Sequence, residues 1–178
     1  MRTVPIQQAH RVKAEIESSK TILKTLTADD TNDLMNIYGD PDTMEFGSDP
    51  VFTSQDMVEQ LLKSIADFEK NGFSYEWGIV EKETQRVIGT CGLHSFTPCR
   101  TRCEVGCLLN SDYWRLGYMS DALTALFSHA ASIDITELVA DIDSKNTRSI
   151  GLFTKLGFIR QPSSYLYILP LRHAMRDK

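Results

Sequence analysis

The chain has 178 residues, of which 42% are hydrophobic and 24% charged, and its formal net charge is −5 at pH 7. These values are typical of one globular domain that is long enough to bury a core, and they exclude a largely disordered chain. The negative balance argues against nucleic acid as the main partner, because nucleic-acid-binding domains normally present a basic face.

Two kinds of targeting segment are not evident in the sequence. Residues 1–20 contain no apolar core of a secretory signal, and no stretch approaches the ~18 consecutive apolar residues of a membrane-spanning helix. We therefore expect a cytoplasmic protein without a membrane partner.

The four cysteines lie close together in the sequence, at Cys91, Cys99, Cys103 and Cys107, with His94 among them. Their C-x3-C-x3-C spacing differs from the C-x2-C pairs usual in zinc motifs, and the last two fall in a strand-like run. In a cytoplasmic chain we expect reduced free thiols and no metal.

The first half of the chain predicts two helices and a meander of strands. Residues 1–18 are interpreted as a polar lead-in, and residues 19–178 as the domain. A strand is predicted over 20–26, and a helix begins at the N-cap candidate Thr27 and stops at Asp40–Pro41. Apolar residues at helical spacing from Met57 to Phe68 predict a second helix. Strand-like runs follow over 73–81, 86–94 and 102–110, separated by turn-like segments, which indicates an antiparallel meander.

The second half predicts alternating strands and helices. Apolar positions from Met119 to Ile133 form one helix face, and a strand follows over 137–143. The next helix begins at Asn146 and ends at Gly157, which suits a left-handed cap. Strands over 157–161 and 165–171 close the chain. No repeat or low-complexity linker divides this order, so we expect one mixed α+β domain.

The segment YWRLGYMSDAL, residues 113–123, follows a predicted strand and opens a helix. The first N–H groups of a helix lack intrahelical partners, and the helix dipole adds partial positive charge there. With Gly117 allowing close approach, the N–H groups from Arg115 to Ser120 could surround a phosphate, and the Arg115 guanidinium could add a cation. The same segment could equally be an ordinary turn with Trp114 in the core.

A second segment, NTRSIGLFTKLGF at residues 146–158, follows the next strand. Both helices therefore begin at the same edge of the sheet, where ligands bind in open α/β sheets. Taken together, the two segments resemble the GNAT superfamily of acyl-CoA-dependent N-acyltransferases, and in particular its RimJ/RimL-like branch. The resemblance covers nearly the whole chain after about residue 20, including KTILKTLTADDTNDLMNIYGDPDTM, VIGTCGLHSF and RCEVGCLLNSDYWRLGYMSDAL.

The resemblance implies a fold and an activity. The fold is a single GNAT-like domain whose central, mostly antiparallel, twisted sheet of about seven strands has helices on both faces and splayed central strands. The activity is transfer of an acetyl group from acetyl-CoA to a primary amine by direct attack in a ternary complex. The acceptor is a protein N-terminal α-amine, as in ribosomal proteins, or a small amine. A non-catalytic acyl-CoA-binding or regulatory module and an antibiotic-modifying acetyltransferase are the alternatives, and both a monomer and a homodimer are open.

The resemblance also implies a cofactor site. Its residues are Leu108, Leu109 and Asn110 in the strand, Arg115, Leu116, Gly117, Tyr118, Met119 and Ser120 in the pyrophosphate loop, and Asn146 and Ser149 in the later helix. The loop departs from the family pattern Gln/Arg-x-x-Gly-x-Gly/Ala, because Trp114 and Met119 occupy its first and last places. Arg115 stands where many relatives have glycine.

The same comparison raises the question of how the leaving thiolate is protonated. Many superfamily members have a tyrosine at the place occupied here by Phe153, and a phenyl ring cannot donate a proton. Ser149, one helical turn earlier, carries the hydroxyl that some members of this branch use. An exposed first-turn serine without a chemical role is the alternative.

Amine attack also requires a base, because an alkyl ammonium with a pKa near ~10.4 is almost fully protonated at pH 7. Glu104 is the first candidate, since the branch commonly has a glutamate at this place; pairing with Arg100 or Arg102 is the alternative. His94, at a strand end, is the second candidate, with a solvated histidine as its alternative. Asp141 and Glu76 are held in reserve.

The acceptor side is expected from the first two helices, residues 28–70, and the closing strands, because the other half is assigned to the pyrophosphate. The wall residues predicted for it are Tyr38, Glu45, Phe46 and Tyr75.

Overall fold

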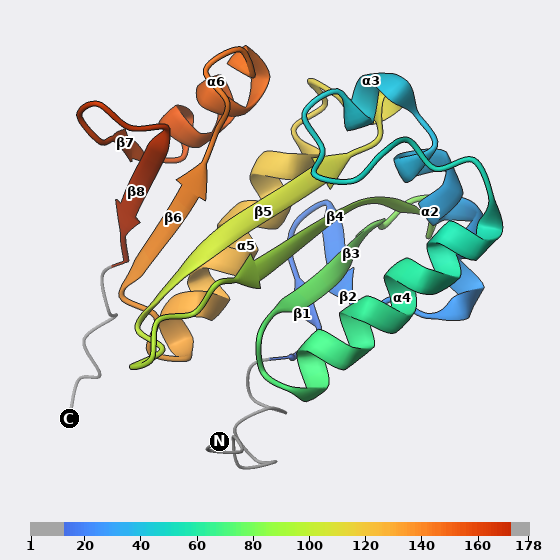
Figure 1. Ribbon diagram of the computed structural model, residues 1–178, viewed down its shortest axis with the longest axis horizontal. Coiled ribbons are helices and arrows are strands. Elements are labelled where there is room, and N and C mark those ends of the chain that lie inside the picture. Colours follow the sequence, from blue (N-terminus) through green and yellow to red (C-terminus); the bar gives the residue numbers. More distant parts are fainter. Residues whose placement is uncertain (1–12, 172–178) are drawn as a thin grey trace.

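Eight strands join into one sheet in the computed structural model, which describes residues 13–171 (Figure 1). The strands are β1 (Ile16–Glu17), β2 (Thr21–Lys24), β3 (Tyr75–Glu81), β4 (Val87–His94), β5 (Arg102–Leu109), β6 (Glu137–Asp141), β7 (Ile159–Arg160) and β8 (Leu166–Pro170). Their order in the sheet is β1-β2-β3-β4-β5-β6-β8-β7, and every neighbouring pair is antiparallel except β5–β6. The predicted mixed α+β domain with a mostly antiparallel sheet is confirmed.

The strand count differs from the expected seven because of β1. This strand has two residues, so it carries no periodic signal, and it lies inside the segment expected to be a polar lead-in. Ile16 pairs with Leu23 of β2. The rest of that segment, residues 1–12, lies outside the described residues, and the domain boundary at residue 19 stays a prediction.

The helices follow the predicted ranges with one subdivision. They are η1 (Ala28–Asp30), α2 (Thr31–Tyr38), α3 (Pro41–Met44), α4 (Gln55–Lys70), η2 (Ser111–Tyr113), α5 (Tyr118–Ser132) and α6 (Thr147–Lys155). The first predicted helix ends before Pro41 as expected, but Asp40 then caps the short helix α3 by accepting from the Asp42 N–H at 3.1 Å. Proline suits the first helical position, because that position needs no N–H donor.

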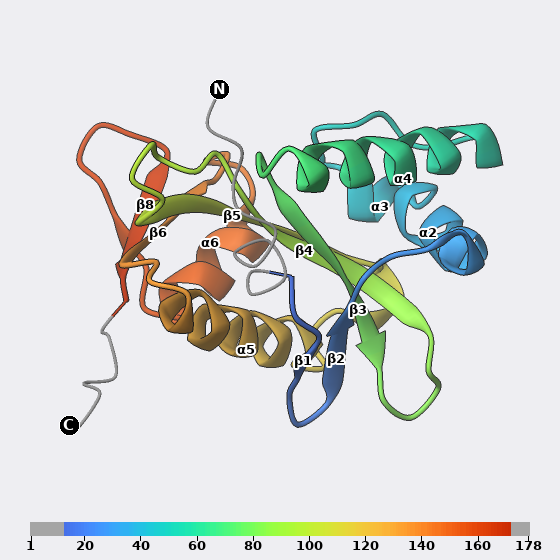
Figure 2. The same cartoon turned by 90° about the horizontal axis from the view of Figure 1, so that it is seen from below.

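Two cores lie on opposite faces of the sheet, since successive strand residues point to opposite sides. Ile79 belongs to the core under α5, and its neighbour Val80 belongs to the core under α2 and α4. Helix α5 buries a stripe at helical spacing that includes Leu123 and Leu126, both with no exposed surface. Figure 2 shows α5 and α6 on one side of the sheet and α2, α3 and α4 on the other.

Strands β5 and β6 part after a short parallel pairing. In the described chain, Arg102–Glu104 of β5 pair with Glu137–Val139 of β6, and β5 then continues to Leu109. Figure 1 shows the two strands diverging, with α6 following the far end of β6. The predicted splay is therefore confirmed, and it opens the sheet next to the amino termini of α5 and α6.

The amino-terminal end of α5 is tied to the β1–β2 turn by one carboxylate. Asp121 accepts hydrogen bonds from the hydroxyls of Ser18 and Ser19, the N–H of Lys20, and both the N–H and hydroxyl of Thr21. Burial alone would raise the pKa of Asp121, but these donors favour the ionised form more strongly and lower its pKa to about 2. The turn thus fixes where α5 begins.

Candidate active site

The opening between β5 and β6 contains two adjoining cavities. The smaller cavity, of about 630 Å³, lies between the end of β5, the loop before α5, and α6. The larger cavity, of about 1800 Å³, lies between α4, strands β3 to β5 and the loops at 46–52 and 95–100. Five residues line both cavities and mark their junction: Phe46, Cys107, Leu108, Asn146 and Ser149.

The loop at the smaller cavity has the backbone geometry of an anion cradle. Gly117 is left-handed with a φ of 86°, and it is the residue before the first turn of α5. Arg115 is also left-handed, with a φ of 62°, a conformation that favours the glycine which the family resemblance implies at this place. Arg115 and Gly117 are exposed, so their backbone groups are accessible to a ligand.

Trp114 in this loop is half-buried rather than part of either core. Its indole N–H donates to the Leu109 carbonyl at 2.8 Å, and the Arg148 guanidinium lies 4.1 Å above its ring. Arg148 also pairs with Glu45 at 2.8 Å and lies over Phe46. The start of α6 is thereby linked across the opening to the segment after α3.

One cation beside this loop was missed by the sequence interpretation. The Lys20 ammonium donates to the Leu116 carbonyl at 2.9 Å, although almost a hundred residues separate the two in the chain. Nothing in the local sequence around Lys20 signals this contact, because it depends on the β1–β2 turn packing against the loop.

The start and end of α6 are as predicted. The Asn146 side chain accepts from the Ser149 N–H at 3.0 Å, which confirms the N-cap. Gly157 is left-handed with a φ of 95° and closes the helix. Phe153 borders the larger cavity but is only 3% exposed and packs edge-on against Phe158 at 5.0 Å, whereas Ser149 lies at the junction of the two cavities.

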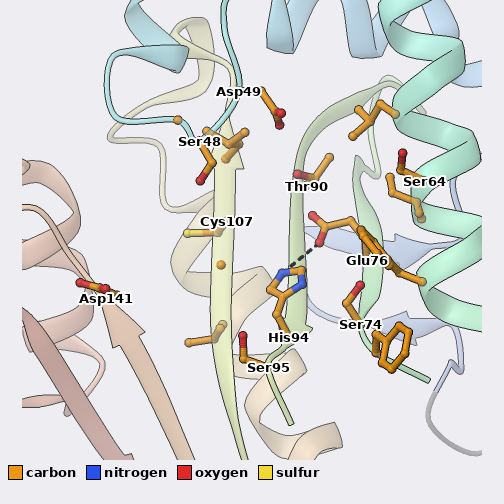
Figure 3. A pocket seen from close by; sticks show the side chains of 18 of the residues that line it. Ser48, Asp49, Ser64, Ser74, Glu76, Thr90, His94, Ser95, Cys107 and Asp141 are labelled. Atoms are coloured by element: carbon orange, nitrogen blue, oxygen red, sulfur yellow. Dashed lines mark ion pairs between the residues drawn. The ribbon is translucent and has the colours of Figure 1, made fainter. Parts of the chain in front are cut away.

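The larger cavity contains an imidazole–carboxylate pair (Figure 3). His94 Nε2 lies 3.2 Å from Glu76 Oε2, and their side chains are 33% and 15% exposed. Strand register explains the meeting: Glu76 is opposite Gly92, which is two residues before His94 on the same face. A Cβ on Gly92 would meet the Glu76 carboxylate and lie 2.6 Å from His94 Nε2, so glycine leaves the space that the pair occupies.

The environment changes the protonation of His94. Burial disfavours the imidazolium, but the hydrogen bond and charge of Glu76, with a further contribution from the charge of Glu104, outweigh it. The pKa of His94 is therefore raised above its ordinary value. Such a group holds a proton more strongly than an isolated imidazole does.

Glu104, the first candidate for the base, lies opposite His94 in the sheet but lines neither cavity. Its carboxylate accepts from the Ser95 hydroxyl at 2.8 Å. The alternative, an ion pair of Glu104 with Arg100 or Arg102, does not form. Arg100 instead donates to the Gly72 carbonyl at 2.9 Å, and Arg102 pairs with Glu137 at 3.0 Å. Asp141, held in reserve, lines the larger cavity.

Most of the predicted cofactor residues line the smaller cavity, and two do not. Those that do are Leu108, Leu109, Arg115, Gly117, Tyr118, Met119, Ser120, Asn146 and Ser149. Asn110 is instead buried, donating its amide to the Asn36 carbonyl at 2.7 Å and capping η2. Leu116 does not line this cavity; its side chain is exposed, and its carbonyl accepts from the Lys20 ammonium.

Of the four residues predicted for the acceptor side, two line the larger cavity and two line neither cavity. Tyr38 lines the larger cavity, where it stacks on Phe52 at 4.9 Å and shares a hydrogen bond with Thr90, and burial raises its pKa. Phe46 lines both cavities. Glu45 forms an ion pair with Arg148 and lines neither cavity. Tyr75 also lines neither cavity, because its position in β3 turns it into the core on the α5 side.

Three further findings concern the thiols, groups of metal-binding side chains and the length of the apolar helices. All four cysteines are free thiols: burial raises the pKa of Cys103 and of Cys107 to about 12, whereas hydrogen bonds with Thr101 and Thr97 lower the pKa of the exposed Cys99 to about 7. Within residues 13–171, no cluster of three or more histidine, cysteine or acidic side chains could hold a metal ion. In the same range, no helix is long and apolar enough to span a bilayer.

The splayed sheet with helix amino termini at its opening is the architecture of the GNAT acetyltransferases, and the chain belongs to that family. A family model described as Acetyltransferase (GNAT) domain matches residues 20–159. Curated relatives include the uncharacterized N-acetyltransferase p20 of Bacillus licheniformis, 26% identical over 81% of this chain and 82% of its own, and the uncharacterized N-acetyltransferase YoaA of Bacillus subtilis (strain 168), 26% identical over 82% and 83%. The protein is therefore an acetyl-CoA-dependent acyltransferase.

Solved structures share the fold at lower sequence identity. An acetyltransferase (GNAT family) from Bacillus anthracis aligns with a TM-score of 0.77 and 16% identity over 88% of this chain and 98% of its own. RimL, a ribosomal L7/L12 alpha-N-protein acetyltransferase in complex with coenzyme A, aligns with a TM-score of 0.73 and 17% identity over 89% and 98%. The ribosomal-protein-S5-alanine acetyltransferase of Vibrio fischeri gives 0.72 and 16% over 89% and 97%.

Proposed function

We propose that the protein acetylates the α-amine of a polypeptide N-terminus, with acetyl-CoA bound in the smaller cavity and the acceptor amine in the larger one. The observation that carries this proposal is the His94–Glu76 pair, whose side chains line the larger cavity together with the junction residues Cys107 and Ser149. The cavity that contains the base thus opens into the cavity proposed for the cofactor.

The residues of the smaller cavity fit the cofactor that the family uses. The left-handed Gly117 and the first turn of α5 offer N–H groups to a diphosphate, and the cations Arg115 and Lys20 lie beside them. Beyond Glu104, the β6-facing edge of β5 has backbone groups that can bind the amides of an extended arm. A Cβ on Gly151 of α6 would have nothing within 4 Å, so this wall leaves room.

Acetyl-CoA, when bound, supplies the acetyl group as a thioester. His94 acts as the base: its Nε2–H donates to Glu76, which leaves Nδ1 to accept a proton from the acceptor ammonium. Glu76 is a positioning residue that holds the imidazole and stabilises its protonated form. Glu104 raises the pKa of His94 from the next strand and acts on the reaction through that effect.

Ser149 is the proposed donor to the leaving sulfur. Its Oγ belongs to a residue at the junction of the cavities, on the same face of α6 as Phe153 one turn later. Phe153 is buried against Phe158 and has no proton to give. The serine hydroxyl therefore takes the role that a tyrosine would have at position 153: it passes its proton to the departing thiolate and regains one from the newly acylated nitrogen.

A polypeptide is favoured over a small amine by the dimensions of the larger cavity. Pockets for small molecules usually measure ~300–1,000 Å³, whereas this one measures about 1800 Å³. The carboxylates of Glu76, Asp49 and Asp141 line it and attract an ammonium group. Two neighbours in fold carry names that refer to N-terminal or ribosomal-protein acetylation, which agrees with this choice.

The test measures thiol release from acetyl-CoA with a panel of free-amine peptides and small amines, and mass spectrometry locates the acetyl group. We expect His94→Gln to lower kcat by ~10²–10⁴-fold. Glu76→Gln should move the acid limb of the kcat/KM profile to lower pH, since Glu76 raises the pKa of His94. Glu104→Gln should shift that limb in the same direction with a smaller loss of kcat.

Three results would contradict the proposal. If Glu104→Gln loses as much kcat as is expected for His94→Gln, while His94→Gln keeps the wild-type rate, Glu104 is the base. Binding of acetyl-CoA by calorimetry without turnover of any acceptor would indicate a non-catalytic module. Turnover of small amines with no peptide acetylated would place the acceptor in another class.

A further inference from the structure

The outer part of the larger cavity presents two exposed phenylalanines. Phe68, at the end of α4, is 52% exposed, and Phe73, just before β3, is 65% exposed, and both line this cavity. Helix α4 continues the apolar wall inward through Leu61 and Ile65, which line the cavity and are only partly buried. This face of α4 therefore packs against the second core and also borders the open cavity.

The backbone holds both rings in place. Gly72 is left-handed with a φ of 70°, the Phe73 N–H donates to the Phe68 carbonyl at 2.9 Å, and the Gly72 N–H donates to the Glu69 carbonyl at 2.9 Å. This is the pattern of a Schellman cap, which brings the residues at the two phenylalanine positions together. The exposure of the rings is thus a property of an ordered turn.

A cation and a third ring complete this region. Arg100 donates to the Gly72 carbonyl at 2.9 Å, and its guanidinium lies 4.1 Å above the ring of Phe96, which also lines the cavity. The second guanidinium nitrogen, Nη2, is buried and has no hydrogen-bond partner among the described residues. We call Phe68, Phe73, Phe96 and Arg100 the aromatic rim.

The rim lies a short distance along the chain from the His94–Glu76 pair. Phe73 is three residues from Glu76, and Phe96 is two residues from His94, so the Cα atoms of these two pairs lie at most about 11 Å and about 7 Å apart. An extended acceptor peptide covers the same span in two to three residues. A small amine held at the base would end before it reached the rim.

The charges along the cavity give the acceptor a direction. Carboxylates of Glu76, Asp49 and Asp141 suit its ammonium end, whereas the rim offers aromatic surface and the Arg100 guanidinium. A basic side chain at the rim would meet Arg100, and an acidic one would have to lie against exposed phenyl rings. An apolar side chain, with a nearby backbone carbonyl facing Arg100, satisfies both features.

We infer that the aromatic rim is a specificity subsite for a large apolar side chain at the second or third residue of the acceptor polypeptide. This inference rests on the proposed function, since it requires a peptide amine at the His94–Glu76 pair. It adds a sequence preference that the transfer reaction itself does not need.

The experiment compares free-amine hexapeptides that differ only at the second or third residue, which is phenylalanine, leucine, alanine, aspartate or lysine. We expect kcat/KM to be about tenfold higher for phenylalanine or leucine than for alanine, the size of a partly exposed apolar contact. In the double variant Phe68→Ala/Phe73→Ala this ratio should fall to about 2, while the alanine peptide keeps its rate. Tyr165→Ala is the matched control, because Tyr165 is 58% exposed and lines neither cavity.

The outcomes separate the two proposals. A ratio that stays near ten in the double variant, or a wild-type ratio near one, overturns the rim as a subsite while peptide turnover upholds the proposed function. No acetylation of any peptide by the wild type overturns both. Should sedimentation show a wild-type dimer that the double variant abolishes, with an unchanged peptide ratio, the rim is a contact between copies. Retained turnover of the alanine peptide shows that the double variant is folded.

Discussion

Replacement of Asp121 by asparagine should remove a pH-dependent part of the protein's stability. The carboxylate has an ordinary pKa of 3.8, and its donors in the β1–β2 turn lower it to about 2. One pKa unit corresponds to about 1.36 kcal/mol, so lowering this pKa from 3.8 to about 2 contributes about 2 kcal/mol to the free energy of unfolding once solvent screening of the carboxylate is allowed for.

The sign follows from the order of the two pKa values. Because the folded value is the lower one, the unfolded chain binds more protons between pH 2 and pH 4. The contribution is therefore complete above about pH 5 and is lost as the pH falls through the folded pKa. Asp121→Asn should lose about 2 kcal/mol at pH 7, equivalent to about 4–8 °C in Tm, and should approach the wild type in acid.

The assay is urea unfolding followed by tryptophan fluorescence from pH 7 to pH 3. Asp67→Asn is the matched control, since Asp67 is an exposed carboxylate on α4. The difference between wild type and Asp121→Asn should shrink with falling pH, and the difference for the control should stay flat. A difference below about 0.5 kcal/mol at pH 7, or one of the same size at pH 3, would refute the assignment of this stability to the ionised carboxylate.

Three further substitutions test the site from its backbone. Gly92→Ala places a Cβ 2.6 Å from His94 Nε2. It should lower kcat/KM by about 100-fold at nearly unchanged Tm, because small misplacements of catalytic groups have effects of that size. Wild-type activity in this variant would show that catalysis does not need the His94–Glu76 pair. Arg115→Gly relieves a left-handed arginine and should raise the free energy of unfolding by about 1 kcal/mol in urea while weakening coenzyme A binding in calorimetry; tighter binding would exclude a phosphate role for its guanidinium. Gly151→Ala lies in open space in a helix interior and should stabilise by about 0.5–1 kcal/mol in thermal unfolding; an unchanged affinity for coenzyme A would remove this part of α6 from the cofactor groove.

Several features of the site were predictable because each depends only on residues that are close together in the sequence. The N-cap at Asn146 needs its own side chain and the N–H three residues later, and the cap at Gly157 needs one residue without a Cβ. Each of these signals involves residues within one or two turns of one another.

The pairing of His94 with Glu76 could not be predicted in this way. Sequence interpretation preferred Glu104 and kept Glu76 in reserve, because strand alternation shows which face a residue takes but not which residue lies opposite. The register that sets Glu76 across from Gly92 depends on the length and turns of the whole meander. Lys20 beside Leu116 is a contact of the same kind.

The sequence by itself thus determined most of the helices and strands in their order along the chain, together with the caps of α6, because periodicity and terminal hydrogen bonds act over a few residues. Only the tertiary structure decided which side chains share a cavity. Tyr75, predicted as a wall residue, lies in the core, while Phe68 and Phe73 line the cavity with exposed rings. The physical reason is that burial of a side chain depends on what packs above its face of the sheet, and that is settled only when distant segments meet.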